Sequence, residues 1–158
     1  MEKEFKKIIG ESKTSLKKME KYLEAKSEDF TEEVNVFWHD LKKQLSHIDE
    51  KLQETYDHFE DQAELKGHLG LMEARDRVEK IQETTREFTD KIANNAQEKL
   101  DIAALRVHLA KMESEDLWEE KQKELLHIYD DARDEAQKAA AKAAKELNNM
   151  ILKLTEII

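Results

Sequence analysis

Apolar side chains recur along this chain at intervals of three and four residues, which is the spacing of one face of an α-helix. The first such run predicts an amphipathic helix over residues 3–26. It ends in the polar sequence Lys-Ser-Glu-Asp, where Asp29 can cap the next helix and Glu32 can complete a capping box. Trp38 follows the first apolar positions of that next helix, and we expect it to pack at their edge or beneath the first helix.

The longest apolar register begins at Val34 and keeps the same phase past Gly67 and Gly70. Its steps of 3-4-4 form an eleven-residue repeat, which gives about 3.67 residues per turn and a nearly straight packing seam. A turn between two helices normally resets this phase, so the pattern favours one helix over residues 30–96, roughly 100 Å long. The alternative is a turn or hinge near residues 61–70, because each glycine within a helix costs about 1 kcal/mol relative to alanine.

A second break is predicted between Asn94-Asn95 and Asp101. Asp101 is the expected N-cap of a third helix over residues 102–157. The segment from residue 136 to 144 is mostly alanine and lysine, so it combines high helix propensity with small side chains on the packed face.

These elements predict an all-α protein, an elongated antiparallel bundle or coiled coil that forms one domain over residues 1–158. If the chain folds back near residue 98, the two long helices form a hairpin, and the first helix covers part of it. The two glycines of the second helix would then face Ile128 and Tyr129. Half of such a hairpin buries little surface, which favours a homodimer. With a turn near residues 61–70, the alternative is a four-helix up-down bundle.

Two segments forty residues apart, 61–79 and 101–119, match in residue type at nine positions. Forty residues is close to eleven helical turns, so both copies face in similar directions, and we interpret them as a duplicated helical unit. The match creates a second apolar stripe, away from the main seam. We expect this stripe to be covered within a bundle or dimer, or to bind a partner helix. It consists of Leu65, Leu69, Met72, Leu105, Leu109 and Met112.

Composition supports helices and limits the partners. The 158 residues are 41% charged and 39% hydrophobic, with three glycines and no proline, as in long helices and coiled coils. The net charge of −10 disfavours nucleic acid as the main partner. Residues 1–26 are locally basic, with eight lysines against five glutamates, so the first helix is expected to dock on the acidic remainder.

The chain has no cysteine, which excludes disulfides, thiolate metal sites and cysteine nucleophiles. No apolar leader and no run of about 18 apolar residues is present, so no transmembrane segment is expected, and a cytoplasmic location is the default.

Histidines near carboxylates at helical spacing are the candidate metal ligands: His68, Asp76, His108, Asp116, Glu124 and His127. Glu124 and His127 match the Glu-x-x-His spacing of di-iron bundles, but such bundles need two of these motifs. A methionine lies among each of the other two sets, and thioether beside carboxylate is not a coherent ligand set. We therefore expect no metal and no cofactor. A phosphate-binding glycine loop and a Ser-His-Asp pattern are also missing, so we expect no enzymatic activity.

The eleven-residue register over residues 34–96 resembles the repeats of apolipoprotein-type and desiccation-protein helices. The resemblance implies an amphipathic protein of the stress type that binds lipid or unfolded surfaces. Those repeats place Lys and Arg beside a broad apolar face, whereas this seam is narrow and the chain is acidic, so peripheral lipid contact is not favoured. The leading hypothesis is a non-enzymatic helical-bundle interaction protein that self-associates or serves as a scaffold or adaptor. The stress-type protein and a metal-binding bundle are the alternatives.

Overall fold

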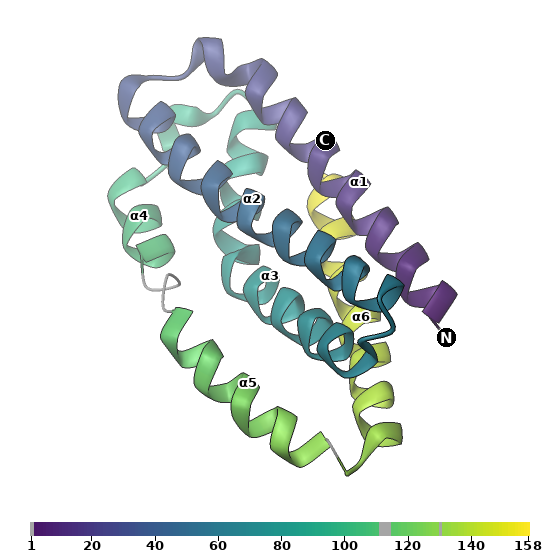
Figure 1. Cartoon of the computed structure of the whole chain (residues 1–158). Coiled ribbons are helices and arrows are strands. Elements are labelled where there is room, and N and C mark those ends of the chain that lie inside the picture. Colours follow the sequence, from purple (N-terminus) through teal and green to yellow (C-terminus); the bar gives the residue numbers. More distant parts are fainter. Residues whose placement is uncertain (1, 111–114, 130) are drawn as a thin grey trace.

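The computed structural model of the chain describes residues 2–110, 115–129 and 131–158, and the side chains of all these residues except 115–117. Within these ranges it contains six α-helices, two 3-10 turns and no β-strand (Figure 1). The helices are α1 (Glu2–Lys26), α2 (Glu32–Glu60), α3 (Glu64–Ala93), α4 (Ile102–Ala110), α5 (Glu115–Tyr129) and α6 (Arg133–Thr155). The all-α prediction is confirmed. The count of three helices is wrong, because the second and third predicted helices are each divided.

Four helices form the core bundle, in which α1 and α3 each pack against both α2 and α6. Figure 1 shows α2 antiparallel to α1 and α3, and α6 parallel to them. Two ion pairs fit the parallel arrangement of α3 and α6: Arg133 with Glu64, and Arg75 with Glu146. The chain can enter α6 in this direction because α4 and α5 first carry it back along the bundle. The four-helix alternative is therefore right about the turn between α2 and α3 and wrong about the direction of the last helix.

The turn that ends α2 is a Schellman motif. Gln62 has a φ of 61°, its N–H donates to the carbonyl of Phe59 (3.3 Å), and the Ala63 N–H donates to that of His58 (2.8 Å). One helix over residues 30–96 is thus wrong. The turn lets α2 and α3 pack side by side along their apolar faces, whereas a single long helix would leave those faces open.

Local backbone conformation and hydrogen bonds also determine where the neighbouring helices begin and end. Asn95 has a φ of 54° and ends α3 in a second Schellman motif, at the predicted position. Asp101 caps α4, because its Oδ1 accepts a hydrogen bond from the Ala104 N–H at 3.1 Å. The predicted cap Asp29 is wrong, since it lies in a 3-10 turn and Thr31 caps α2 instead.

Gly67 and Gly70 allow α3 to approach α2 closely. A Cβ on Gly67 would lie 2.8 Å from Cε1 and Cζ of Phe59, and one on Gly70 would overlap Oγ1 of Thr55. The prediction that these glycines face Ile128 and Tyr129 is therefore wrong. They face α2, where the side chains of Phe59 and Thr55 occupy the space that a Cβ would need.

Aromatic side chains fill both ends of the bundle. Trp38 is buried beneath α1, as predicted, and its Nε1 donates to Glu24 Oε2 at 2.8 Å. Its ring stacks on Phe88 with centroids 6.2 Å apart. At the other end, Phe5 of α1 stacks on Phe59 of α2 at 5.1 Å.

Helices α4 and α5, which connect α3 to α6, lie outside this bundle. α4 packs against α2 and α3 through the buried Leu105 and Leu109, and α5 packs mainly against α3. Between residues 118 and 129, no side chain of α5 is fully buried. α5 is therefore attached to the bundle more loosely than the other helices. In the described ranges, none of the helices combines the length and apolarity that crossing a membrane requires.

Candidate binding surfaces

The apolar stripe that the sequence suggested as a partner-binding face is largely covered by the chain itself. Leu69, Leu105 and Leu109 lie in the interior, and Leu65 and Met72 are half-buried. Met112 is outside the described residues. A partner helix could reach the three buried leucines only if α4 or α5 moved away.

The candidate metal ligands are dispersed. His68 is buried, Asp76 pairs with Arg75 and Lys121, and His108, Glu124 and His127 are exposed. The side chain of Asp116 is outside the description. Over the ranges that the structure covers, no group of three or more histidine, cysteine or acidic side chains is arranged to hold a metal ion.

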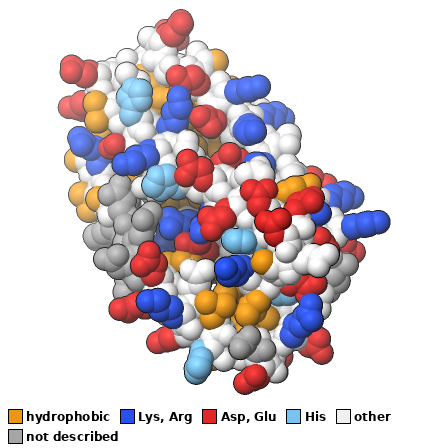
Figure 2. Space-filling model, viewed as in Figure 1, with side chains coloured by type: hydrophobic (Ala, Val, Ile, Leu, Met, Phe, Trp, Pro, Cys, Tyr) orange, Lys and Arg blue, Asp and Glu red, His pale blue; other side chains and the backbone are white. Residues whose placement is uncertain are grey.

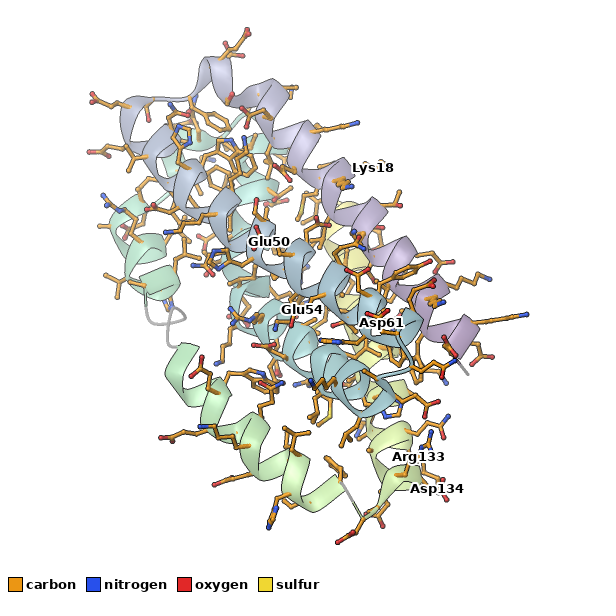
Figure 3. The ribbon with its side chains drawn as sticks, viewed as in Figure 1. Lys18, Glu50, Glu54, Asp61, Arg133 and Asp134 are labelled. Carbon is orange, nitrogen blue, oxygen red and sulfur yellow. The ribbon has the colours of Figure 1, made fainter. Side chains whose placement is uncertain are left out.

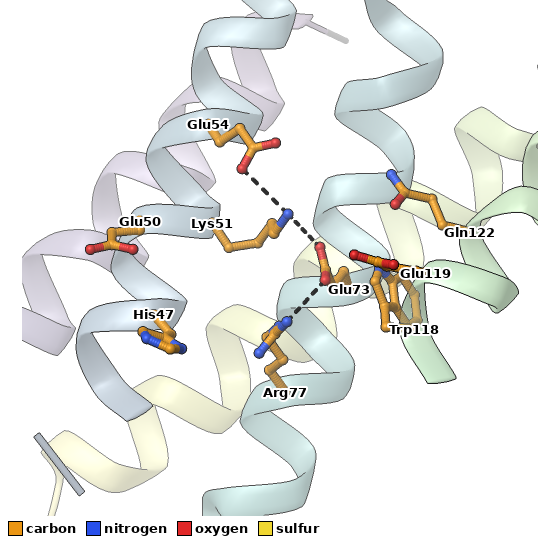
Figure 4. A pocket seen from close by; sticks show the side chains of 9 residues that line it. All are labelled: His47, Glu50, Lys51, Glu54, Glu73, Arg77, Trp118, Glu119 and Gln122. Atoms are coloured by element: carbon orange, nitrogen blue, oxygen red, sulfur yellow. Dashed lines mark hydrogen bonds and ion pairs between the residues drawn. The ribbon is translucent and has the colours of Figure 1, made fainter. Parts of the chain in front are cut away.

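A polar cleft of about 420 Å³ lies between α2, α3 and α5 (Figure 4). Glu73 of α3 lies at its centre, with a side chain only 5% exposed. Lys51 Nζ is 2.7 Å from Glu73 Oε2, and Arg77 Nη2 is 3.2 Å from Glu73 Oε1. Each carboxylate oxygen thus faces a cation, which offsets the cost of burying the charge.

This network is suited to structure and not to proton transfer. Burial by itself lowers the pKa of Lys51, but the hydrogen bond to Glu73 and the charges of Glu73 and Glu54 outweigh it, so the pKa is raised. A lysine held in its protonated form is neither a base nor a nucleophile at neutral pH. Sequence reasoning missed this site. The available signal was Arg77 four residues after Glu73, the spacing of an ion pair on one helix.

A second cleft, of about 400 Å³, lies between the start of α3, the end of α5 and the start of α6. Leu65, Leu126 and Tyr129 give it apolar walls, and all three are half-buried. Arg133 pairs with Glu64 beside it, with Nε 3.1 Å from Glu64 Oε2. The pair balances its own charge, and the exposed Lys66 adds one positive charge at the rim, so the cleft combines apolar walls with a polar edge.

His68 also lines this second cleft and is 4% exposed. Its imidazole lies 5.6 Å from the ring of Phe5 and 5.8 Å from that of Phe59, centroid to centroid. Burial lowers the pKa of His68, against a smaller opposing effect of the Glu64 charge, so the ring is neutral at pH 7. Among the described residues, Nδ1 of His68 has no hydrogen-bond partner.

Two oppositely charged stripes lie next to each other on the outside of α1 and α2. The exposed lysines of α1 form the basic stripe: Lys3, Lys7, Lys17, Lys18 and Lys21. The acidic stripe follows the second half of α2: Glu50, Glu54, Asp57, Glu60 and Asp61. Figure 3 labels Lys18 on one and Glu50, Glu54 and Asp61 on the other, and Figure 2 shows acidic side chains gathered over this half of α2.

The basic stripe is not neutralised by the rest of the chain. Within the described ranges, none of its five lysines forms an ion pair. The expected docking of the first helix on the acidic remainder is limited to contacts such as Lys6 with Glu60 (2.6 Å). Further exposed lysines follow the outside of the neighbouring helix α6, at Lys138, Lys142, Lys145 and Lys153. In the sequence, these lysines could be recognised as exposed by their helical spacing along the alanine-rich segment.

Comparison with protein-family models, with curated proteins and with solved structures gives no match for this chain. Its function must therefore be inferred from its own residues.

Proposed function

We propose that this protein is a non-enzymatic helical bundle that acts by self-association, with two copies meeting through the outer faces of α1 and α2. The observation that carries the proposal is the pair of exposed, oppositely charged stripes on these neighbouring helices. Exposed charges are common singly, but five lysines on one helix beside five acidic residues on its neighbour make a surface that is complementary to itself. The exposed Glu4 and Glu11 interrupt the basic stripe, and Glu54 and Glu60 of the acidic stripe also form ion pairs within the chain.

The complementarity follows from two-fold symmetry. A two-fold axis parallel to the helices, placed between two facing copies, sets α1 of each copy against α2 of the other. Such an axis keeps residues at the same level along the bundle. Lys6 pairs with Glu60, and Lys13 hydrogen bonds to Gln53. These contacts show which residues of α1 and α2 lie at the same height along the bundle. Lys7 would therefore meet the Asp57–Asp61 region of the partner copy, and Lys18 would meet the region of Glu50.

Gly10 supports this assignment. It lies on the exposed side of α1, between the two groups of lysines, and a Cβ built on it meets nothing within 4 Å. A glycine within a helix costs about 1 kcal/mol relative to alanine, and packing inside this chain does not require it. At the proposed interface, the missing side chain would allow α1 to approach the partner helix closely.

Sedimentation velocity at low and high salt tests the proposal. Surface ion pairs contribute at most about 1 kcal/mol each and weaken as salt shortens the Debye length, so the dimer should be salt-sensitive. We expect a dimer at about 20 mM NaCl and a monomer at about 500 mM. A monomer at both salt concentrations, at high protein concentration, would refute self-association through these stripes.

A second candidate is binding to an anionic lipid surface. It is favoured by the α6 lysines, which extend the basic surface beyond the proposed dimer face, and by Leu152 beside them, which is 43% exposed. Flotation with vesicles of phosphatidylserine and phosphatidylcholine tests it, with Lys142→Glu/Lys145→Glu as the variant. Recovery of the wild type and not the variant would support lipid binding; absence of the wild type from the vesicle fraction would exclude it.

A further inference from the structure

We propose that the cleft between α3, α5 and α6 is a binding site for a small, uncharged, mostly apolar molecule that carries one hydrogen-bonding group, held against the imidazole of His68. This site is independent of the proposed dimer face, which lies on α1 and α2. It also differs from the polar cleft, at whose centre a buried carboxylate forms ion pairs with two cations.

The size and lining of the cleft indicate the apolar part of the ligand. Its volume of about 400 Å³ is within the range of small-molecule sites, roughly 300–1,000 Å³. Leu65, Leu126 and Tyr129 line it and each keeps part of its surface exposed. An apolar molecule placed between them would remove this surface from water, which is the main source of affinity at such sites.

The charges around the cleft argue against an ionic ligand. Arg133 and Glu64 neutralise each other, and two hydrogen bonds join them. Lys66 also lines the cleft, but it is exposed to solvent, so an ion pair with it would contribute at most about 1 kcal/mol. To pair with Arg133, an anion would have to displace Glu64, and to pair with Glu64, a cation would have to displace Arg133. Either exchange replaces an existing ion pair with an equivalent one and adds the cost of removing the ligand charge from water.

His68 supplies the specific contact. Its ring packs at an angle against the stacked rings of Phe5 and Phe59, so it is fixed before a ligand arrives. Being neutral, it offers one nitrogen as a donor and one as an acceptor. Its Nδ1 is buried and lacks a hydrogen-bond partner within the described part of the chain, and such an atom in an otherwise apolar environment has a cost. A ligand hydrogen bond to the imidazole would give the ring the polar contact that the surrounding aromatic side chains do not.

The loose attachment of α5 provides access. Leu126 and Tyr129 belong to this helix, in which none of the side chains between residues 118 and 129 is fully buried. A small outward movement of α5 would admit a ligand without disturbing the four-helix bundle, because α6 and α3 hold the other walls.

Indole and 1-methylindole are suitable probes, because they share an apolar body and differ in one N–H. We expect saturable chemical-shift changes in ¹⁵N-labelled protein at residues around His68 and Leu126, with indole bound roughly three- to tenfold more tightly than 1-methylindole. Absence of saturable shifts with indole up to its solubility limit would overturn the proposal, as would shifts spread over the whole molecule.

Two variants separate the apolar and polar contributions. Leu126→Arg should abolish binding of both probes, whereas Ile128→Arg, at a position 60% exposed outside the cleft, should leave it unchanged. His68→Leu puts an apolar side chain in place of the imidazole and should remove the preference for indole over 1-methylindole. If Leu126→Arg proves unfolded by circular dichroism, the His68→Leu comparison decides. Retention of the indole preference in His68→Leu would refute the role of the imidazole.

Discussion

The two sides of α2 differ in what covers them. Toward α3, the side chain of Thr55 lies so close to Gly70 that a Cβ has no room there. On the outer side, next to α1, the surface carries charged stripes, and Gly10 has open space around it. Packing within the chain thus explains the glycine at position 70 and does not explain the glycine at position 10. From this difference we infer that the outer side is shaped by contact with another molecule.

The largest contrast is expected from glycine-to-alanine substitutions. Gly70→Ala should destabilise the protein by about 1–3 kcal/mol, because the new Cβ overlaps the Thr55 side chain and forces Thr55 to shift. Gly10→Ala should stabilise the monomer by up to about 1 kcal/mol. Urea unfolding at about 500 mM NaCl, where the proposed dimer is dissociated, measures both. Equal effects of the two substitutions would contradict the difference between the two sides.

Removing one acidic charge should also act differently on the two sides. Glu73→Gln leaves Lys51 and Arg77 partly buried without their carboxylate, and we expect a loss of about 1–2 kcal/mol, less than for a fully buried pair. Asp57→Asn, at an exposed position of the acidic stripe outside the polar cleft, should change stability by less than about 0.5 kcal/mol. Thermal unfolding at high salt compares them. If Glu73→Gln left the stability unchanged, the polar cleft would have to be solvated.

The pH dependence of stability should reveal the buried imidazole. The pKa of His68 lies below its ordinary value of 6.5 in the folded state, so the unfolded chain takes up this proton first. The contribution of His68 to the free energy of unfolding is complete above pH 6.5. It is lost as the pH falls toward the pKa of His68 in the folded state, with a slope of at most about 1.4 kcal/mol per pH unit. His68→Gln should flatten this slope and the exposed-site control His127→Gln should not. Identical pH profiles of His68→Gln and wild type would contradict the burial of His68.

The smallest expected effect is on local opening. Backbone amides of α5 should exchange with deuterium faster than those of α6, because α5 has no fully buried side chain from residue 118 to 129, whereas Leu147 and Ile151 anchor α6. Hydrogen–deuterium exchange at high salt tests this. Equal protection of the two helices would show that α5 is a full member of the bundle.

The sequence revealed those parts of the fold that depend on local chemistry. Asp101 caps a helix, Asn95 ends one, and Trp38 packs beneath α1 where the apolar pattern placed it. The turn at Gln62 was hidden for a physical reason. Glutamine is not a usual residue at positive φ, and the short turn preserved the apolar phase that normally changes between helices.

The candidate surfaces were only partly visible in the sequence. The match between segments 61–79 and 101–119 drew attention to Leu65 and His68, which do line a cleft. The other walls come from Leu126 and Tyr129, about sixty residues away in the sequence. That juxtaposition depends on the break before α6, which the strong helix propensity of the alanine-rich segment concealed. The local basicity of residues 1–26 was visible, whereas its position beside the acidic half of α2 required the turn at Gln62.

A charge-exchange experiment tests the proposed self-association most directly. Lys7→Glu/Lys18→Glu places acidic side chains opposite the acidic stripe of a second copy, and Glu50→Lys/Asp61→Lys places lysines opposite its basic stripe, so neither variant alone should form a dimer. Mixed in equal amounts at about 20 mM NaCl, the two variants should form a heterodimer in sedimentation velocity, and the dimer should dissociate at about 500 mM. Homodimers of either variant, or a mixture that stays monomeric while the wild type dimerises, would contradict pairing of α1 with α2 across the interface.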